Sequence, residues 1–191
     1  MANQRIKIKE TKILSNNWYT LKKITFDYFT NNSEWIEQSR EAYDRGNGAV
    51  ILLYNTDKQT VILTKQFRMP TYINGNSDGM LIEACAGLLD TDDPETAIIR
   101  ETEEETGYKI KEIEKVYECY MSPGSVTEIL YFFIAKYTNE TEKNIGGGID
   151  NEDIKVLEIP FSEALSKIKT GEIKDAKTIM LIQHLRLEAY L

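Results

Sequence analysis

The sequence predicts an α/β fold, in which a mixed sheet flanked by helices follows a smaller N-terminal antiparallel sheet. Strand-like segments rich in Val, Ile, Phe and Tyr recur along the chain, with few helical segments among them. Residues 49–55 and 60–68 are almost continuously apolar, which is typical of buried central strands. A length of 191 residues suffices for one domain with a core, or for a domain with an accessory lobe.

Composition excludes several classes of function. Acidic residues outnumber basic ones by 31 to 23, and the absence of a basic tract argues against nucleic-acid binding. No apolar run approaches the ~18 residues of a membrane span, and no signal pattern opens the chain, so we expect a cytoplasmic protein without membrane contact. The two cysteines, Cys85 and Cys119, form no metal-binding motif. A single histidine, His184, in an apolar helical pattern disfavours Ser-His and Cys-His mechanisms.

The N-terminal segment, residues 1–45, is expected to form a separate antiparallel sheet. Residues 4–14, 18–29 and 34–44 alternate apolar with polar side chains, and Asn31-Asn32 marks a hairpin turn. Three strands bury little apolar surface alone, so this sheet must pack on the main domain or on a second subunit. The turn at residues 45–48 then leads into the main domain, residues 46–191.

The main domain continues with alternating elements. After the two apolar strands we expect a loop over residues 69–80, a strand over 81–87, and a helix between Pro94 and Gly107. Strands are expected at 109–122, 128–138 and 154–160, the last preceded by the glycine-rich acidic loop 146–153. Two helices end the chain, the first capped by Ser162 and the second near residues 175–190.

An acidic cluster lies on the central helix. Glu101, Glu104 and Glu105 have the i, i+3, i+4 spacing that places side chains on one helical face, while Glu103 points elsewhere. Like charges so placed repel one another by a few tenths of a kcal/mol per pair. A divalent cation with oxygen ligands would relieve that repulsion. The alternative is a solvated acidic helix face.

The stretch Arg100-Glu101-x-x-Glu104-Glu105-x-Gly107, behind Gly87, resembles the Nudix box G-x5-E-x7-R-E-U-x-E-E-x-G-U. Three details differ: Gly87 lies one residue closer to the helix, Asp92 replaces a glutamate, and Thr102 replaces an aliphatic residue. The resemblance implies an α/β/α sandwich that hydrolyses a nucleoside diphosphate linked to another group. It also implies Mg²⁺ as the cofactor, with Mn²⁺ as an alternative.

The same resemblance implies roles for the acidic residues. Metal ligands would be Glu101, Glu105, Glu152 and the backbone carbonyl of Ala86, and the catalytic set would be Glu104, Glu105 and Glu152. Arg100 would orient Glu104 at i, i+4. The loop 146–153 is either a mobile surface loop or a lid that supplies a general base, with Glu152 ahead of Asp150.

The chain is similar over nearly its full length to the ADP-sugar and GDP-mannose pyrophosphatase branch of the family. The stretches that carry this similarity are 39–48, 66–68, 86–90, 120–124, 146–148 and 170–178. Arg68 is the strongest candidate for a phosphate ligand, whereas Trp18 could instead be a core or interface residue, and Arg40 and Lys177 solvated charges. The substrate contacts implied are Trp18, Ser39, Arg40, Glu41, Arg68, Ala86, Gly87, Leu88, Glu128, Asn151 and Lys177.

Three functions follow as hypotheses. The first is Mg²⁺-dependent hydrolysis of GDP-mannose, a small-molecule nucleotide sugar, to GMP and mannose 1-phosphate. The second is an ADP-ribose or ADP-sugar pyrophosphatase, which composition does not distinguish from the first. The third is a non-enzymatic sensor of nucleotide sugars. The branch resemblance also implies a homodimer in which the N-terminal sheet is exchanged or packed across the two-fold axis.

Overall fold

The computed structural model describes residues 5–149 and 152–191. The chain divides into two compact units. One contains the described residues up to Asn47 together with Tyr120–Ile129, and the other contains Gly48–Cys119 together with the described residues after Ile129. No helix in the described part of the chain is long and apolar enough to cross a membrane.

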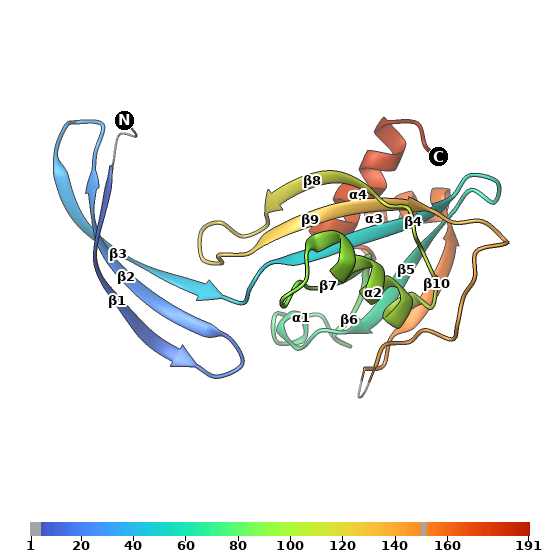
Figure 1. Cartoon of the computed structure of the whole chain (residues 1–191), viewed down its shortest axis with the longest axis horizontal. Coiled ribbons are helices and arrows are strands. Elements are labelled where there is room, and N and C mark those ends of the chain that lie inside the picture. The colour runs from blue at the N-terminus through green and yellow to red at the C-terminus, as the bar shows by residue number, and fades with distance from the viewer. Residues whose placement is uncertain (1–4, 150–151) are drawn as a thin grey trace. The chain divides into compact units, whose positions relative to one another are not determined.

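The N-terminal unit is built on an antiparallel sheet of three strands, as predicted. The strands β1 (Ile6–Asn16), β2 (Thr20–Phe29) and β3 (Trp35–Asp44) lie in the order β1-β2-β3 (Figure 1). The segment 120–129 is held to the end of β3, because Tyr43 N–H donates to Ser125 O over 2.7 Å and Thr127 N–H donates to Tyr43 O over 3.1 Å.

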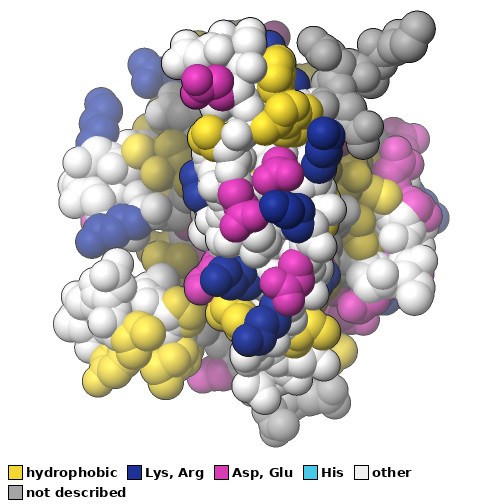
Figure 2. Space-filling view, turned by 90° about the vertical axis from the view of Figure 1, so that its left-hand side faces the viewer, with side chains coloured by type: hydrophobic (Ala, Val, Ile, Leu, Met, Phe, Trp, Pro, Cys, Tyr) yellow, Lys and Arg dark blue, Asp and Glu magenta, His cyan; other side chains and the backbone are white. Residues whose placement is uncertain are grey.

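The two faces of this sheet differ in chemistry. Residues directly opposite one another on paired strands share a face. One face carries the cross-strand row Lys7–Asp27–Glu37, and Lys9 adds ion pairs to both carboxylates of that row. In Figure 2, which looks at the N-terminal unit, basic and acidic side chains are interleaved. The other face carries the rows Ile6–Tyr28–Ile36 and Ile8–Phe26–Gln38, and the exposed fraction of Ile8 is 61%.

The larger unit contains a mixed sheet, which confirms the predicted fold class. Its central strand, β4 (Gly48–Asn55), is parallel to β9 (Ile129–Lys136) and antiparallel to β5 (Thr60–Phe67). The strands β10 (Lys155–Pro160) and β8 (Glu114–Tyr120) lie at the two ends of the order β10-β5-β4-β9-β8. Every residue of β4 is buried, as its continuous apolar sequence predicts.

Helices cover both faces of the mixed sheet. The helix α2 (Pro94–Thr106) lies on one face, and α3 (Phe161–Thr170) and α4 (Ala176–Leu187) lie on the other (Figure 1). The core on the α2 side joins Ile98 of this helix to alternate residues of the sheet, including Ile51 and Phe133. Three helices around one sheet give the layered α/β arrangement expected from the sequence.

The stretch predicted as one strand over 81–87 is two short strands. Met80–Glu83 (β6) pairs with β5, whereas Cys85–Leu88 (β7) pairs with β4. The chain changes partner at Ala84, whose N–H donates to the Thr178 hydroxyl over 2.7 Å instead of to a strand. This switch places Glu83 beside α4 and the β7 backbone beside α2, so it organises the candidate site.

Several predicted boundaries were wrong. The expected loop 69–80 begins with a short helix, α1 (Met69–Ile73), and the strand expected from residue 109 begins only at Glu114, because 107–109 bond to 142–144 instead. Ser162 does not cap α3. That helix begins at Phe161, whose N–H donates to Gln59 O over 2.8 Å, so the first donor is satisfied by the β4–β5 turn.

Candidate active site

Helix α2 begins and ends where the sequence predicts. The Asp93 side chain accepts hydrogen bonds from the N–H groups of Glu95 and Thr96, each over 3.1 Å. Gly107, at φ 81°, ends the helix in the left-handed conformation that glycine adopts without strain. Thr102, where the Nudix pattern has an aliphatic residue, is fully buried, and its hydroxyl donates to Ile98 O over 2.6 Å. Its polar group is therefore satisfied inside the core.

Glu105 is a buried carboxylate on the inner side of this helix. Its exposed fraction is 4%, and its buried Oε2 atom has no hydrogen-bond partner among the described residues. Burial raises the pKa of Glu105 to about 7; the Cys85 thiol and the Arg68 charge oppose that rise, while the charges of Glu101 and Glu152 add to it. The carboxylates of Glu101, Glu105 and Glu152 therefore lie close enough to repel one another.

Glu101 packs directly over the backbone of β7. A Cβ atom built on Gly87 would lie 2.2 Å from Cδ of Glu101, so any other residue at position 87 would displace this carboxylate. Burial raises the pKa of Glu101, and the Arg100 charge opposes that rise. Ala86, Gly87 and Leu88 pair through their backbones with Val50, Ala49 and Gly48 of β4.

Arg100 joins the acidic residues on the outer side of α2. Its Nη1 donates to Glu101 Oε1 over 3.1 Å and to Glu104 Oε2 over 3.2 Å, and its Nε lies 3.7 Å from Asp92 Oδ2. The pairing with Glu104 predicted from the i, i+4 spacing is thus present. Binding of a cation by Glu101 would compete with this contact.

The cluster has the donor set that a hard divalent cation requires. Glu105 offers an unpartnered buried oxygen, and Glu101 offers a second carboxylate with a raised pKa. Carboxylates and backbone carbonyls are the ligands that Mg²⁺ prefers, and a bound cation would relieve the repulsion between the acids. Among the described residues, no three Asp, Glu, His or Cys side chains already converge on one point suited to a metal ion.

Basic side chains lie next to the acidic cluster. Arg68, at the end of β5, donates to the Glu83 carboxylate from Nε over 2.6 Å and from Nη2 over 3.3 Å. Lys177, in the first turn of α4, donates to Glu83 Oε2 over 2.5 Å and to Asp175 Oδ1 over 2.8 Å. Burial lowers the pKa of Arg68, but the hydrogen bonds to Glu83 and the charges of Glu83, Glu105 and Asp175 together raise this pKa above its ordinary value. Arg68, Lys177 and Glu105 therefore belong to one connected site.

Glu83 is the residue of this site that the sequence analysis missed. It lies in an apolar strand-like stretch and matches no part of the Nudix box, so no motif pointed to it. A single charged residue in such a stretch was the one available hint, because charges are seldom fully buried unless paired.

The three consecutive glycines after Ile145 dock on the C-terminal end of α2. Gly147 N–H donates to Glu105 O over 2.8 Å and Gly148 N–H donates to Glu104 O over 3.0 Å. All three glycines have positive φ angles, and a Cβ on Gly146 would meet the backbone of Thr106 at 2.6 Å. These glycines satisfy carbonyl groups that the helix end leaves free.

The acidic part of this loop follows directly. Glu152 Oε2 accepts a hydrogen bond from Ile149 N–H over 3.1 Å. The predicted substrate residue Asn151 and the alternative base Asp150 lie outside the described residues.

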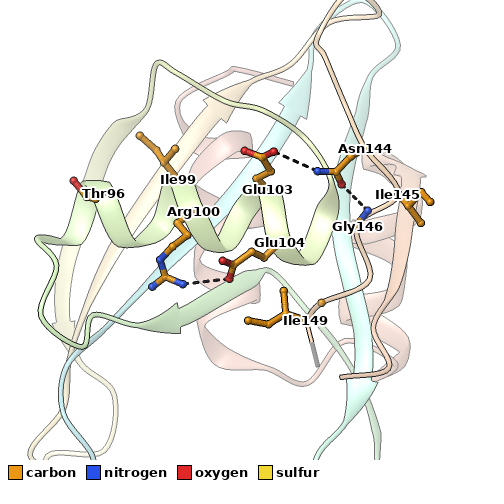
Figure 3. Close-up of a pocket in the computed structure, with 10 residues that line it drawn as sticks. Thr96, Ile99, Arg100, Glu103, Glu104, Asn144, Ile145, Gly146 and Ile149 are labelled. Carbon is orange, nitrogen blue, oxygen red and sulfur yellow. Dashed lines mark hydrogen bonds and ion pairs between the residues drawn. The ribbon is translucent and has the colours of Figure 1, made fainter. Parts of the chain in front are cut away.

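An open groove of about 820 Å³ runs between the outer side of α2 and this loop (Figure 3). Arg100 and Glu104 form one wall, and Asn144 bonds to the Glu103 carboxylate across the helix end. The apolar part of the lining comes from Ile99, Ile145 and Ile149. The groove thus extends outward from Glu104, the outermost acid of the cluster.

The other predicted substrate residues belong to the N-terminal unit. Trp18 lies in the bend between β1 and β2 and is 86% exposed, so it is neither on a strand nor in a core; β1 continues to Asn16 and pairs there with Thr20. Ser39 and Glu41 lie on the charged face of the sheet, whereas Arg40 lies on the other face and bonds to Ser39 O and Gln38. Within this sheet the side chains of Ser39 and Glu41 therefore share one face, and the side chain of Arg40 lies on the opposite face.

Glu128 is held within the same unit. Its carboxylate lies 3.6 Å from Arg45 Nε, and its side chain is 13% exposed. Arg45 also lies over the ring of Tyr19, which packs edge-on against Tyr43. Glu128 is thus part of a small aromatic and ionic cluster at the end of β3.

Comparison with known proteins gives matches over the whole chain. Residues 5–43 match the family described as the GDP-mannose pyrophosphatase NudK N-terminal domain, and residues 44–182 match the NUDIX domain family. A protein of Escherichia coli (strain K12) named GDP-mannose pyrophosphatase is 56% identical over 183 residues, which cover 96% of each chain. A protein of Salmonella typhimurium with the same name is 54% identical over 184 residues, again 96% of each chain.

The fold also has a match among solved structures. A crystal structure of an ADP compounds hydrolase superposes with a TM-score of 0.75 over 100% of both chains, at 14% sequence identity. This likeness confirms the α/β fold predicted from the sequence.

Proposed function

This chain belongs to the Nudix hydrolase family, and we propose that it hydrolyses the pyrophosphate bond of GDP-mannose to give GMP and mannose 1-phosphate. The buried Glu105 carboxylate, with one unpartnered oxygen beside Arg68 and Glu101, is the observation that carries this proposal. The substrate follows from the relatives named GDP-mannose pyrophosphatase, which match this chain at 54–56% identity over 96% of its length.

Glu101, Glu105, Glu152 and the carbonyl of Ala86 would hold the divalent cation, Mg²⁺ or alternatively Mn²⁺. When bound, such a cation neutralises phosphate charge and makes water a stronger nucleophile at neutral pH. The Arg100 contacts hold Glu101 and Glu104 along the outer side of the helix. Gly87 leaves the space that Glu101 occupies.

The remaining groups act on the substrate and on protons. Arg68 and Lys177 provide the positive charge that binds the anionic diphosphate, and the planar Arg68 guanidinium suits phosphate oxygens. Glu152 accepts the proton of the attacking water, with Asp150 as the alternative base. Glu104, held by Arg100, completes the acidic set. Gly87, Leu88 and Asn151 are further contacts that we propose for the substrate.

The N-terminal unit would bind the nucleotide end and form a homodimer. Trp18 offers an exposed aromatic face to a base, and Ser39, Arg40, Glu41 and Glu128 would contribute polar contacts. In the dimer, the apolar face of the sheet formed by residues 1–45 would be covered by a second copy of the chain. Residues 46–191 would form the hydrolase domain. The cytoplasmic location expected from the sequence stays a prediction.

A panel of sugar nucleotides with Mg²⁺ tests the proposal. GDP-mannose should be turned over fastest, with GMP and mannose 1-phosphate as products identified by mass spectrometry. Faster turnover of ADP-ribose would replace the substrate but keep the reaction. Binding without turnover of any member of the panel would favour the nucleotide-sugar sensor and refute the enzyme.

A further inference from the structure

Glu83 links two cations that come from distant parts of the sequence. Its carboxylate accepts two hydrogen bonds from Arg68, at the end of β5, and one from Lys177, in the first turn of α4. The Glu83 side chain is only 3% exposed, whereas the side chains of Arg68 and Lys177 are 39% and 15% exposed. The carboxylate thus lies beneath the two cations, and the cations form the accessible layer.

The position of Glu83 is fixed from both sides. The hydroxyl of Thr178 accepts from Ala84 N–H over 2.7 Å and donates to Asp175, the residue that caps α4. Thr64 on β5 donates to Glu83 O over 3.3 Å. The strand β6, the strand β5 and the start of α4 are therefore tied together at the residue that holds the two cations.

Arg68 and Lys177 each keep N–H groups that their carboxylate partners do not use. Toward the described residues, Arg68 donates from Nε and Nη2 to Glu83, which leaves its Nη1 group to donate to a ligand. Lys177 donates to Glu83 and Asp175, which leaves one of its three N–H groups. Two cations held on one carboxylate, each with an unused donor, suit a ligand with two linked phosphates.

We propose that Glu83 is a positioning residue, which holds Arg68 and Lys177 side by side as a preformed clamp for the diphosphate of the substrate. The inference rests on the proposed hydrolysis of a nucleotide sugar. A buried ion pair with a purely structural role is the competing explanation, because such pairs often contribute little beyond local order. The two explanations differ in what they predict for substrate binding.

The first experiment compares Glu83→Gln with the wild type. Glutamine keeps the size of the side chain but loses its charge, so both cations lose their common anchor. We expect the KM for GDP-mannose to rise roughly 10- to 100-fold, which is the scale of a misplaced binding group, while kcat changes less. Glu83→Asp keeps the charge on a shorter side chain and should recover part of the loss.

A matched control separates positioning from general destabilisation. Glu158→Gln removes another carboxylate of the same unit, which bonds to Lys58 Nζ and to Tyr137 OH, each over 3.0 Å. Glu158→Gln should leave the KM unchanged, even if thermal unfolding shows a lower Tm for both Glu83→Gln and Glu158→Gln. An equal KM in Glu83→Gln and the wild type would refute the proposal.

A combined variant tests whether Glu83 acts through its two partners. If Glu83 works by positioning Arg68 and Lys177, adding Glu83→Gln to an Arg68→Gln/Lys177→Gln variant should leave the KM nearly unchanged. A further rise in KM as large as the one that Glu83→Gln causes in the wild type would contradict the proposal.

Binding of inorganic pyrophosphate without Mg²⁺, measured by calorimetry, gives a readout independent of catalysis. Glu83→Gln should bind it roughly 10-fold or more weakly than the wild type. A wild type that binds pyrophosphate but hydrolyses no nucleotide sugar would refute the proposed function and keep the clamp. Equal affinities of the wild type and Glu83→Gln would refute the clamp alone.

Discussion

The Glu101 carboxylate occupies the space that a side chain on Gly87 would need, since a Cβ there would lie 2.2 Å from Cδ and 2.6 Å from Oε1 of Glu101. The glycine of the loop and the first glutamate of the helix are therefore one structural unit. The separation of these two residues along the chain matters less than their contact across β7 and α2.

Gly87→Ala should displace Glu101 from its place over β7. We expect turnover of GDP-mannose to fall roughly 100-fold, because a shift of about 1 Å in a catalytic group has effects of this size. Steady-state kinetics with a Mg²⁺ titration measures both the rate and the cation requirement. Gly124→Ala is the control, since its added Cβ would meet no described residue within 4 Å beyond its chain neighbours, and its φ is not in the left-handed region. Normal turnover in Gly87→Ala would show that hydrolysis does not depend on the position of Glu101 over β7.

Glu105→Gln should separate activity from stability. Loss of the proposed metal ligand should lower turnover roughly 10²–10⁴-fold, because a bound cation supplies several kcal/mol of transition-state stabilisation. Stability at pH 8 should be maintained or increased, since the amide removes a buried charge. Glu95→Gln, an exposed change on the same helix, is the control for both measurements. Turnover near the wild-type rate would remove Glu105 from the mechanism.

The raised pKa of Glu105 also predicts how stability without metal depends on pH. The folded-state pKa of about 7 exceeds the value of 4.5 that is ordinary for a glutamate, so folding favours the protonated acid. This contribution is complete below pH 4.5 and is lost as the pH rises through 7. At about 1.4 kcal/mol per pKa unit, the loss is about 3 kcal/mol.

The difference in unfolding free energy between the wild type and Glu105→Gln isolates this effect. Urea denaturation in EDTA from pH 4.5 to 8 should show the wild type losing stability relative to the variant. Parallel pH profiles would contradict the raised pKa.

Binding of Mg²⁺ should release protons and stabilise the fold. A cation binds the ionised carboxylate, so about one proton should be released from Glu105 per protein at pH 6, and little at pH 8. Calorimetry in buffers of different ionisation enthalpy measures this release. At 100 times the dissociation constant, Mg²⁺ should stabilise the fold by about 2.7 kcal/mol. A protein that neither binds Mg²⁺ nor needs it for turnover would contradict the proposed site.

Ile8→Lys should disrupt the proposed homodimer. Ile8 lies on the apolar face of the N-terminal sheet and is 61% exposed, so the substitution costs little within one chain but places a charge in the interface. Light scattering after gel filtration should shift from dimer to monomer. Glu10→Lys, on the charged face opposite Thr25, is the control and should stay dimeric. A wild-type monomer with full activity would refute the dimer.

Local patterns predicted most of the elements and the acidic helix. The spacing of Asp93, Pro94 and Gly107 fixed the ends of α2, because capping depends on adjacent residues alone. Continuous apolar sequence identified β4 as a central strand. The boundaries that the sequence missed at α3 and β8 depend on hydrogen bonds to residues distant in the chain, whereas the bonds around α1 stay within residues 68–79.

What the sequence determined by itself was the chemistry of the helix: the capped α2, the order of its glutamates and the glycine-rich segments that resemble the Nudix pattern. Only the tertiary structure decided where charge is buried. Glu83 came to lie beneath Arg68 and Lys177 because the chain changes strand partners at Ala84. The pKa of Glu105 rises because helix packing removes its carboxylate from water. Burial and the pairing of distant charges are properties of the assembled fold, since they depend on which segments meet in space.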